Sequence, residues 1–429
     1  MQIVANLSAV RGSLRPGPTW SAGGFGQRER RRSLAQALCV TLGLGTGLSL
    51  PHVPLHPMIG ADRTANLLFT LGFGVIGLVS IIFSLLFLVV QWAATTFTPR
   101  LGLFRDDPLV WRTFAFSLGV FVFCIAAALT IVSRTEVSMA VPVIAMILAL
   151  VTLAFMYTLQ SRAFSSIQLG PCLHAISSRT RHVVDTVYDR PLGDTDAARS
   201  SRPAEADGAP VPWPGHGAVL CGIDVPTLVE VARAHDCLIV LCQAPGQLLV
   251  RNRPVARVHA GNAGNAGTLP SDVLLAALAP GVERTFDQDP EIGIRLLADI
   301  ALRGLSPAIN DPATAVQALD HIEDLLLLLA DRELDVGHIR DAEGTLRLIV
   351  PVPDWDRYVR TALDDVINSA QTVPLALHRI RLLLQHVLDA GPETRRPQLR
   401  ERLTLVEQLL ARSSPATSAP APAVDTDKK

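Results

Sequence analysis

The chain has 429 residues, of which 49% are hydrophobic, and a formal net charge of −1 at pH 7. This near-neutral charge, without a basic stripe, argues against the class of nucleic-acid-binding proteins, and we expect no nucleic-acid partner. No two of the six cysteines have CxxC spacing, so the sequence indicates neither a disulfide framework nor a zinc site, and we expect no metal and no cofactor.

The first 162 residues contain four long stretches without Asp, Glu, Lys or Arg. Apolar runs at residues 67–90, 114–132 and 137–159 reach the length of about 20 residues that a helix needs to cross the hydrocarbon core of a bilayer. We therefore predict a membrane domain over residues 33–162, after a disordered or mis-started segment at residues 1–32. Its spans are predicted at about residues 34–50, 67–92, 113–132 and 137–160.

The first span is the weakest of the four. Residues 34–50 contain three glycines and end before Pro51. Because Arg31 and Arg32 precede this segment, it also fits a signal peptide of the twin-arginine type. We favour a membrane anchor, because no convincing cleavage site between small residues follows.

The distribution of arginines predicts the orientation of the spans. Flanks rich in arginine alternate with flanks that are poor in it, which places both ends of the domain on the cytoplasmic side of a bacterial inner (plasma) membrane. The soluble part of the chain is then cytoplasmic. The rich flanks carry Arg11, Arg15, Arg28, Arg30, Arg31 and Arg32, then Arg100, Arg105 and Arg112, then Arg162, Arg179 and Arg181, and the poor ones carry Arg63 and Arg134.

Polar residues gather at the predicted cytoplasmic end of the second span, at Gln91, Thr95, Thr96 and Arg100. They would suit the mouth of a pore. The alternative, which we favour, is an ordinary helix end whose hydroxyls bond backbone carbonyls and whose arginine reaches the lipid headgroups. No charged residue lies at mid-membrane depth in the spans, which argues against a coupled pump or transporter.

The chain after residue 162 has the composition of a soluble protein. We predict a helix leaving the membrane at residues 163–189, a linker at 190–215, a small β module at 216–270, a helical domain at 271–412 and a disordered tail at 413–429. The predicted fold class is an α-helical membrane domain of four spans, followed by an α+β soluble domain with a small β module and a C-terminal helical bundle.

Three segments carry a resemblance to a known family. Residues 284–293 (RTFDQDPEIG), 297–312 (LADIALRGLSPAINDP) and 91–100 (QWAATTFTPR) resemble the bacterial membrane-protein family called domain of unknown function 2254. The resemblance extends over most of residues 64–410. It implies an integral membrane protein, and the name of the family carries no activity, substrate or cofactor.

The same region is rich in polar residues, for which three interpretations are open. The first is structural, with two Asp-Pro helix starts and an ion pair between Asp299 and Arg303. The second is a ligand or ion site, and the third is a hydrolytic site at Ser306 with His321 as its base. We favour the structural interpretation, because it gives every residue a role, and we assign no catalytic residue. The motif consists of Arg284, Asp289, Asp299, Arg303, Ser306, Asn310 and Asp311.

These observations favour a non-enzymatic protein of the inner membrane with a cytoplasmic regulatory or assembly domain. We expect the lipid bilayer and further copies of the chain as its partners. The charge-free spans and the polar end of the second span fit an oligomeric channel. The alternative is a membrane-bound enzyme or a ligand sensor that uses the Asp-rich motif at residues 284–312.

Overall fold

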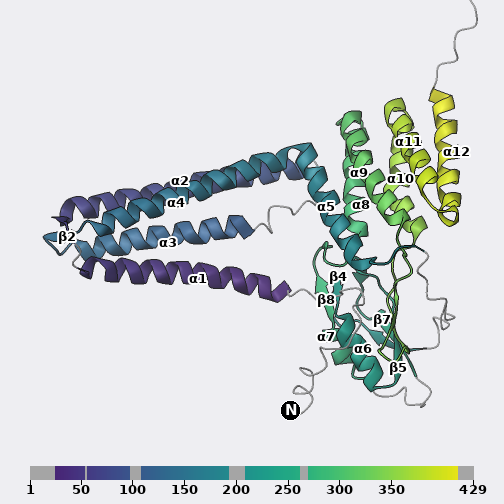
Figure 1. The fold of residues 1–429 in the computed structure, drawn as a ribbon, viewed down its shortest axis with the longest axis horizontal. Helices are drawn as coiled ribbons and strands as arrows, with labels where there is room; N and C mark the ends of the chain where they lie inside the picture. Colours follow the sequence, from purple (N-terminus) through teal and green to yellow (C-terminus); the bar gives the residue numbers. More distant parts are fainter. Residues whose placement is uncertain (1–24, 54–55, 97–107, 193–207, 261–268, 414–429) are drawn as a thin grey trace, which may run out of the picture. The chain divides into compact units, whose positions relative to one another are not determined.

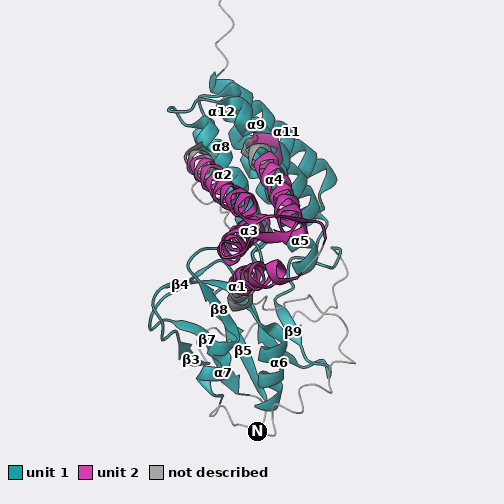
Figure 2. Cartoon of the chain, turned by 90° about the vertical axis from the view of Figure 1, so that its left-hand side faces the viewer, with its two compact units in different colours: residues 1–23, 173–429 teal, residues 24–172 magenta. Residues whose placement is uncertain are grey.

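A computed structural model describes residues 25–53, 56–96, 108–192, 208–260 and 269–413 of the chain. The chain divides into two compact units, shown in different colours in Figure 2. The membrane unit lies within Gly24–Cys172, and the described part of the C-terminal unit lies within Leu173–Lys429. The predicted tail is outside the described residues from residue 414 on.

Four long helices form the membrane unit (Figure 1). They are α1 (Phe25–Ser49), α2 (Ala61–Thr96), α3 (Pro108–Ile131) and α4 (Ala140–Ile167), and a 3-10 turn at Leu50–His52 follows α1. Each of the four is long and apolar enough to cross a membrane. The short strands β1 (Met58–Gly60) and β2 (Glu136–Ser138) pair antiparallel and join the starts of α2 and α4. Four apolar helices ahead of a mixed α/β region confirm the predicted fold class.

The helix α1 starts earlier and packs more closely than the sequence suggests. It begins at Phe25, so residues 25–32 of the segment predicted as disordered are helical. A Cβ atom on Gly43 would lie 2.3 Å from the carbonyl oxygen of Gly119 in α3, and one on Gly119 would lie 2.8 Å from the carbonyl oxygen of Cys39. The two backbones therefore approach so closely that only glycine fits at these positions. The helix α3 is the most buried of the four and also contacts α2 and α4.

The C-terminal unit begins within α5 (Leu169–Val187) and contains two small sheets. The five-stranded sheet has the order β3-β7-β5-β10-β9, and the three-stranded sheet has the order β6-β4-β8. The elements of this part are β3 (Ala209–Pro212), β4 (Ala218–Ile223), α6 (Val225–Ala234), β5 (Cys237–Leu241), β6 (Leu248–Leu249), β7 (Pro254–Ala260), α7 (Ser271–Ala276), β8 (Leu278–Gly281), β9 (His338–Arg340) and β10 (Leu346–Ile349).

Two predicted boundaries differ from these elements. The strand β3 lies inside the stretch predicted as a linker, and β8, β9 and β10 lie inside the stretch predicted as helical. The strands β9 and β10 form a hairpin around Gly344, which has a positive φ of 82°, and β10 runs parallel to β5. A strand this short contains too few residues to show a period of two, so only its pairing with β5 identifies it.

Five helices complete the C-terminal unit: α8 (Glu291–Leu305), α9 (Pro312–Ala330), α10 (Trp355–Ser369), α11 (Pro374–Ala390) and α12 (Arg396–Ser413). The helix α8 packs against α9 and α10, and α11 packs against α9 and α12. Their facing sides are apolar and buried, as in Ile294, Leu326 and Leu384. The helix α5 lies against α8 at Gly293, where a Cβ atom would meet the hydroxyl oxygen of Thr180 at 1.6 Å. This close contact fixes the start of α8, where the polar centre of the unit lies.

Candidate functional site

The polar centre is built at the N-terminal end of α8. Arg284 lies in the loop after β8, Asp289 precedes Pro290, and Glu291 is the first residue of the helix. A proline suits this position because its ring fixes a helical φ, and acidic side chains are favoured there by the positive end of the helix dipole. The local sequence thus brings two carboxylates to one helix end.

Arg284 and Asp289 form a two-pronged ion pair. The guanidinium donates from Nε to Oδ2 at 2.7 Å and from Nη2 to Oδ1 at 2.9 Å. The side chain of Asp289 is 3% exposed and that of Arg284 is 30% exposed. This parallel pair of hydrogen bonds is the strongest geometry available to an arginine and a carboxylate.

A glycine turn presses against this ion pair. Gly246 has a φ of +87°, and its amide donates to the carbonyl of Leu220 in β4 at 2.7 Å. A Cβ atom at Gly246 would lie 2.1 Å from Oδ2 of Asp289. Glycine is therefore required here twice, once for the backbone angle and once for the space that the carboxylate occupies.

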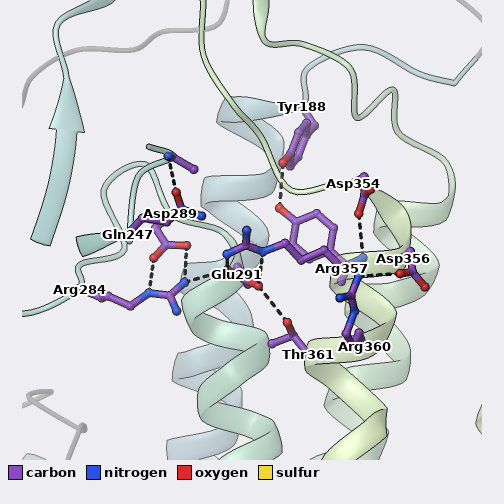
Figure 3. A network of polar contacts seen from close by, with 12 residues as sticks. Tyr188, Gln247, Arg284, Asp289, Glu291, Asp354, Asp356, Arg357, Arg360 and Thr361 are labelled. Carbon is purple, nitrogen blue, oxygen red and sulfur yellow. Dashed lines mark hydrogen bonds and ion pairs between the residues drawn. The ribbon is translucent and has the colours of Figure 1, made fainter. Parts of the chain in front are cut away.

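Glu291 connects this pair to a second arginine (Figure 3). Its carboxylate accepts two hydrogen bonds of 2.9 Å from Arg357 in the first turn of α10, and one of 2.9 Å from the hydroxyl of Thr361. Arg284 adds a contact of 3.2 Å from Nη2. The backbone amide of Arg357 is itself held by the side chain of Asp354, which caps α10. We call Arg284, Asp289, Glu291 and Arg357 the ion-pair cluster.

Burial and pairing shift the two acids in opposite directions. Burial raises the pKa of Asp289, and the bonds and charge of Arg284 only partly oppose it. Burial also acts to raise the pKa of Glu291, but the bonds from Arg357, Thr361 and Arg284 outweigh it, so this pKa is lowered. Glu291 is therefore the more firmly ionised of the two carboxylates.

Two buried tyrosines lie beside the cluster. The hydroxyls of Tyr188, just after α5, and Tyr358, in α10, are 2.8 Å apart and bond to each other. Burial is the main cause that raises the pKa of both phenols, and the neighbouring charges of Asp289 and Glu291 raise it further. Both phenols therefore stay neutral, and their bond ties α10 to the end of α5.

The cluster is internally balanced. Two guanidiniums face two carboxylates, and each of the four carboxylate oxygens accepts at least one hydrogen bond from within the cluster. A carboxylate with all its oxygens occupied is poorly placed to bind a substrate. In the part of the chain that the structure describes, no group of three or more His, Cys, Asp or Glu side chains could hold a metal ion.

Three of the remaining motif residues, Ser306, Asn310 and Asp311, lie just beyond the other end of α8. This helix of 15 residues is about 22 Å long, so Asp289 and Asp311 do not meet. Asp311 caps α9, where its side chain accepts from the amide of Thr314 at 3.3 Å and from its hydroxyl at 2.6 Å. The hydroxyl of Ser306 donates to the carbonyl of Arg303 at 2.7 Å, and Asn310 adopts a positive φ of 48°. These bonds describe the turn between two helices.

The last two motif residues lie within α8, Asp299 near its middle and Arg303 in its last turn. Asp299 forms an ion pair with Arg295, one helical turn before it, at 2.9 Å, and its pairing with Arg303 stays a prediction. The Nε atom of Arg303 is buried without a hydrogen-bond partner among the described residues. The candidate base His321 lies in the third turn of α9, about 13 Å of helix from its start. It is therefore remote from the turn that contains Ser306.

The predicted pore mouth is described only in part. Gln91 is exposed near the end of α2, and Thr95 and Thr96 belong to its last turn. Arg100 lies outside the described residues. The assignment of these four residues to a pore mouth stays a prediction.

The predicted motif contains two of the four cluster residues, Arg284 and Asp289, and leaves out Glu291 and Arg357. Arg357 and Thr361 come from α10, 66 and 70 residues after Glu291, and nothing in their own neighbourhood marks them. Gln288 belongs to the polar run but not to the predicted motif, and its buried amide bonds both the N–H and the carbonyl of Ile223 in β4. The only local signal was the run of polar residues from Arg284 to Glu291.

The comparisons with known proteins agree with this architecture. The family described as Predicted membrane protein (DUF2254) matches residues 32–386. Uncharacterised proteins of Mycobacterium tuberculosis and Mycobacterium bovis are each 28% identical to the chain over 398 residues, which cover 86% of this chain and 74% of the relative. No solved structure is significantly similar to it. With a match over most of its length, the chain belongs to the DUF2254 family of predicted membrane proteins.

Proposed function

We propose that the protein is a non-enzymatic integral protein of the bacterial inner membrane, whose C-terminal unit is a cytoplasmic regulatory or assembly domain. The closed ion-pair cluster carries this proposal, because its charged groups bind one another and join α8 to α10. The alternative, a membrane-bound enzyme or ligand sensor at residues 284–312, has less support. Its motif is divided between the two ends of α8, about 22 Å apart.

The orientation can be tested with reporter fusions to the full membrane unit. Alkaline phosphatase, which is active only in the periplasm, is expected to be silent after Ser413, where green fluorescent protein is expected to fluoresce. A pair of fusions after Val53, between α1 and α2, is the matched control and should give the opposite pattern. Active phosphatase after Ser413 would refute a cytoplasmic C-terminal unit.

Exposed apolar side chains on the three-stranded sheet support an assembly role. Leu248 in β6 is 58% exposed and Val282, just after β8, is 94% exposed. The strand β4 lies between β6 and β8, with Val219 opposite both Leu248 and Gly281. Because exposed apolar groups gather at protein–protein contacts, we propose that copies of the chain meet at this sheet.

Mass photometry of the purified full chain tests this contact. The wild type is expected at a multiple of 46.0 kDa, and the variant Leu248→Asp/Val282→Asp at a lower multiple. The control Leu375→Asp/Leu382→Asp changes two exposed leucines of α11 and should keep the wild-type mass. A wild type that is a single copy, or a sheet variant with unchanged mass, would refute the assembly role.

A channel is the second candidate function, and one face of α2 favours it. Thr70, Gly74, Gly77, Ser84 and Gln91 recur at helical spacing and are exposed, and a Cβ atom on either glycine would meet nothing within 4 Å. Small and hydroxyl-bearing residues are typical of contacts between membrane helices. The interior of the single bundle is filled by apolar side chains, so a path for ions would run between copies.

Recordings from planar bilayers test the channel. The reconstituted wild type is expected to give discrete conductance steps, and Gly77→Leu is expected to abolish them by keeping the helices of neighbouring copies apart. Gly45→Leu is the control, because Gly45 is also exposed and also free of neighbours within 4 Å, but lies on α1. Silent wild-type protein under both voltage and membrane tension would refute the channel.

A further inference from the structure

An apolar groove lies in the membrane unit between α2 and α4, at the ends where both helices begin. Its volume is about 360 Å³. Its apolar lining includes Ile59, Leu67, Met139, Val143, Met146 and Ile147. The last three are 44%, 44% and 54% exposed, so the groove is open to the surroundings of the bundle. A groove of this size lies within the range of about 300–1,000 Å³ typical of small-molecule sites.

One positive charge borders the groove. Arg63, in the first turn of α2, lines it and is exposed. No ion pair of Arg63 is found among the described residues, whereas Arg284, Arg295 and Arg357 in the C-terminal unit are all paired. The neighbouring hydroxyl of Thr64 is already bonded to the carbonyl of Gly60 at 3.0 Å. Arg63 is therefore the group on this rim that can bind an anion.

The groove and the arginine are placed as a lipid would require. Ile147 is seven residues into α4, so the lining reaches about 10 Å below the helix start. Arg63 is at the end of a membrane span, where arginines reach the level of the headgroups. The apolar part thus lies at the depth of the upper acyl chain and the charge at the depth of the phosphate.

We propose that this groove binds one anionic phospholipid, whose acyl chain lies against Val143 and Met146 and whose phosphate pairs with Arg63. Acyl contacts alone would not hold a particular lipid in a bilayer, because the surrounding lipid tails are as apolar as the groove. The selective contact is the ion pair. The property to be measured is therefore a preference among headgroups with identical acyl chains.

Native mass spectrometry of the detergent-solubilised full chain tests the proposal. The protein is titrated with phosphatidylglycerol and, separately, with phosphatidylcholine of the same chains. We expect one tightly held lipid and a preference for phosphatidylglycerol of about three- to five-fold, the strength of an exposed ion pair. Arg63→Gln should bring this preference close to one, and Val143→Trp, which fills the groove, should lose both lipids. Arg112→Gln is the matched control, an exposed arginine near the start of α3.

The outcomes separate the sources of the anion and the kinds of occupant. Excess inorganic phosphate should not displace the lipid if the acyl chain contributes, and displacement would overturn the lipid assignment. Equal retention of the two lipids by the wild type, or a preference that survives in Arg63→Gln, would overturn the role of Arg63. If the wild type has the mass of two copies without bound lipid, and Val143→Trp has the mass of one copy, the groove would be assigned to a second copy of the chain. Because Arg63 is exposed, its variant should melt as the wild type does.

Discussion

Removing Arg284 tests whether the ion-pair cluster stabilises the C-terminal unit. In Arg284→Ala, Asp289 loses both of its guanidinium bonds and remains as an unpaired acid whose side chain is only 3% exposed. Breaking a buried ion pair from one side costs about 3–5 kcal/mol. We expect about 3 kcal/mol, the low end of that range. The Arg284 side chain is partly exposed, so water can enter the space that it leaves and solvate Asp289. At about 2–4 °C per kcal/mol for a unit of this size, the melting temperature should fall by about 6–12 °C.

Thermal unfolding of the full chain in detergent, followed by tryptophan fluorescence, measures this change. Arg360→Ala is the matched control, since Arg360 pairs with Asp356 on the same helix as Arg357 but with side chains 60% and 39% exposed. It should cost less than about 1 kcal/mol. Arg284→Ala/Asp289→Asn should melt above Arg284→Ala, because it also removes the buried acid that has lost its partner. The reasoning would be refuted if Arg284→Ala melted at the same temperature as Arg360→Ala, or if the double variant melted at a lower temperature than Arg284→Ala.

Three further predictions concern pH, the far turn and the glycine. The folded state raises the pKa of Asp289, so the stability that this acid contributes is lost as the pH rises above its ordinary pKa of 3.8. The folded state lowers the pKa of Glu291, so the stability that Glu291 contributes is lost as the pH falls below its ordinary pKa of 4.5. Melting curves across the acid range should therefore show Asp289→Asn gaining on the wild type as pH rises and Glu291→Gln gaining as it falls; parallel curves would contradict both shifts. Asp311→Asn should leave the free energy of unfolding unchanged and Asp311→Ala should lower it by about 0.5–2 kcal/mol, as urea unfolding can measure; equal losses would contradict the cap. Gly246→Ala should lower the melting temperature more than Gly344→Ala, because both glycines have positive φ but only Gly246 also abuts Asp289.

The parts of the fold that depend on short stretches of chain could be predicted from the sequence. Membrane spans follow from local hydropathy, and the four that were predicted correspond to α1 to α4. The cap at Asp311 follows from an Asp-Pro pair, since both capping contacts fall within three residues. Here the physical cause lies inside the same short window as the signal.

The ion-pair cluster could be predicted only in part, because Arg357 lies 66 residues from Glu291 in the chain. Asp289 looks like a second helix cap, and it does bond the amide of Ile292, but its principal partner is Arg284. Glu291 meets Arg357 only because α10 packs on α8 after a hairpin has joined β5. The polar run before α8 therefore shows that partners are needed, and only the tertiary structure shows which residues they are.

The contact between α1 and α3 has a consequence for how the protein enters the bilayer. The window of α1 has a mean hydropathy of 1.4, compared with 2.4 for α3, so it gains little by partitioning into lipid on its own. Its Gly43 lies against Gly119, in a helix that is synthesised after it. Retention of the first span is then coupled to folding of the third. A bulky residue at Gly119 would be observed as a change in the side of the membrane on which the N-terminus resides.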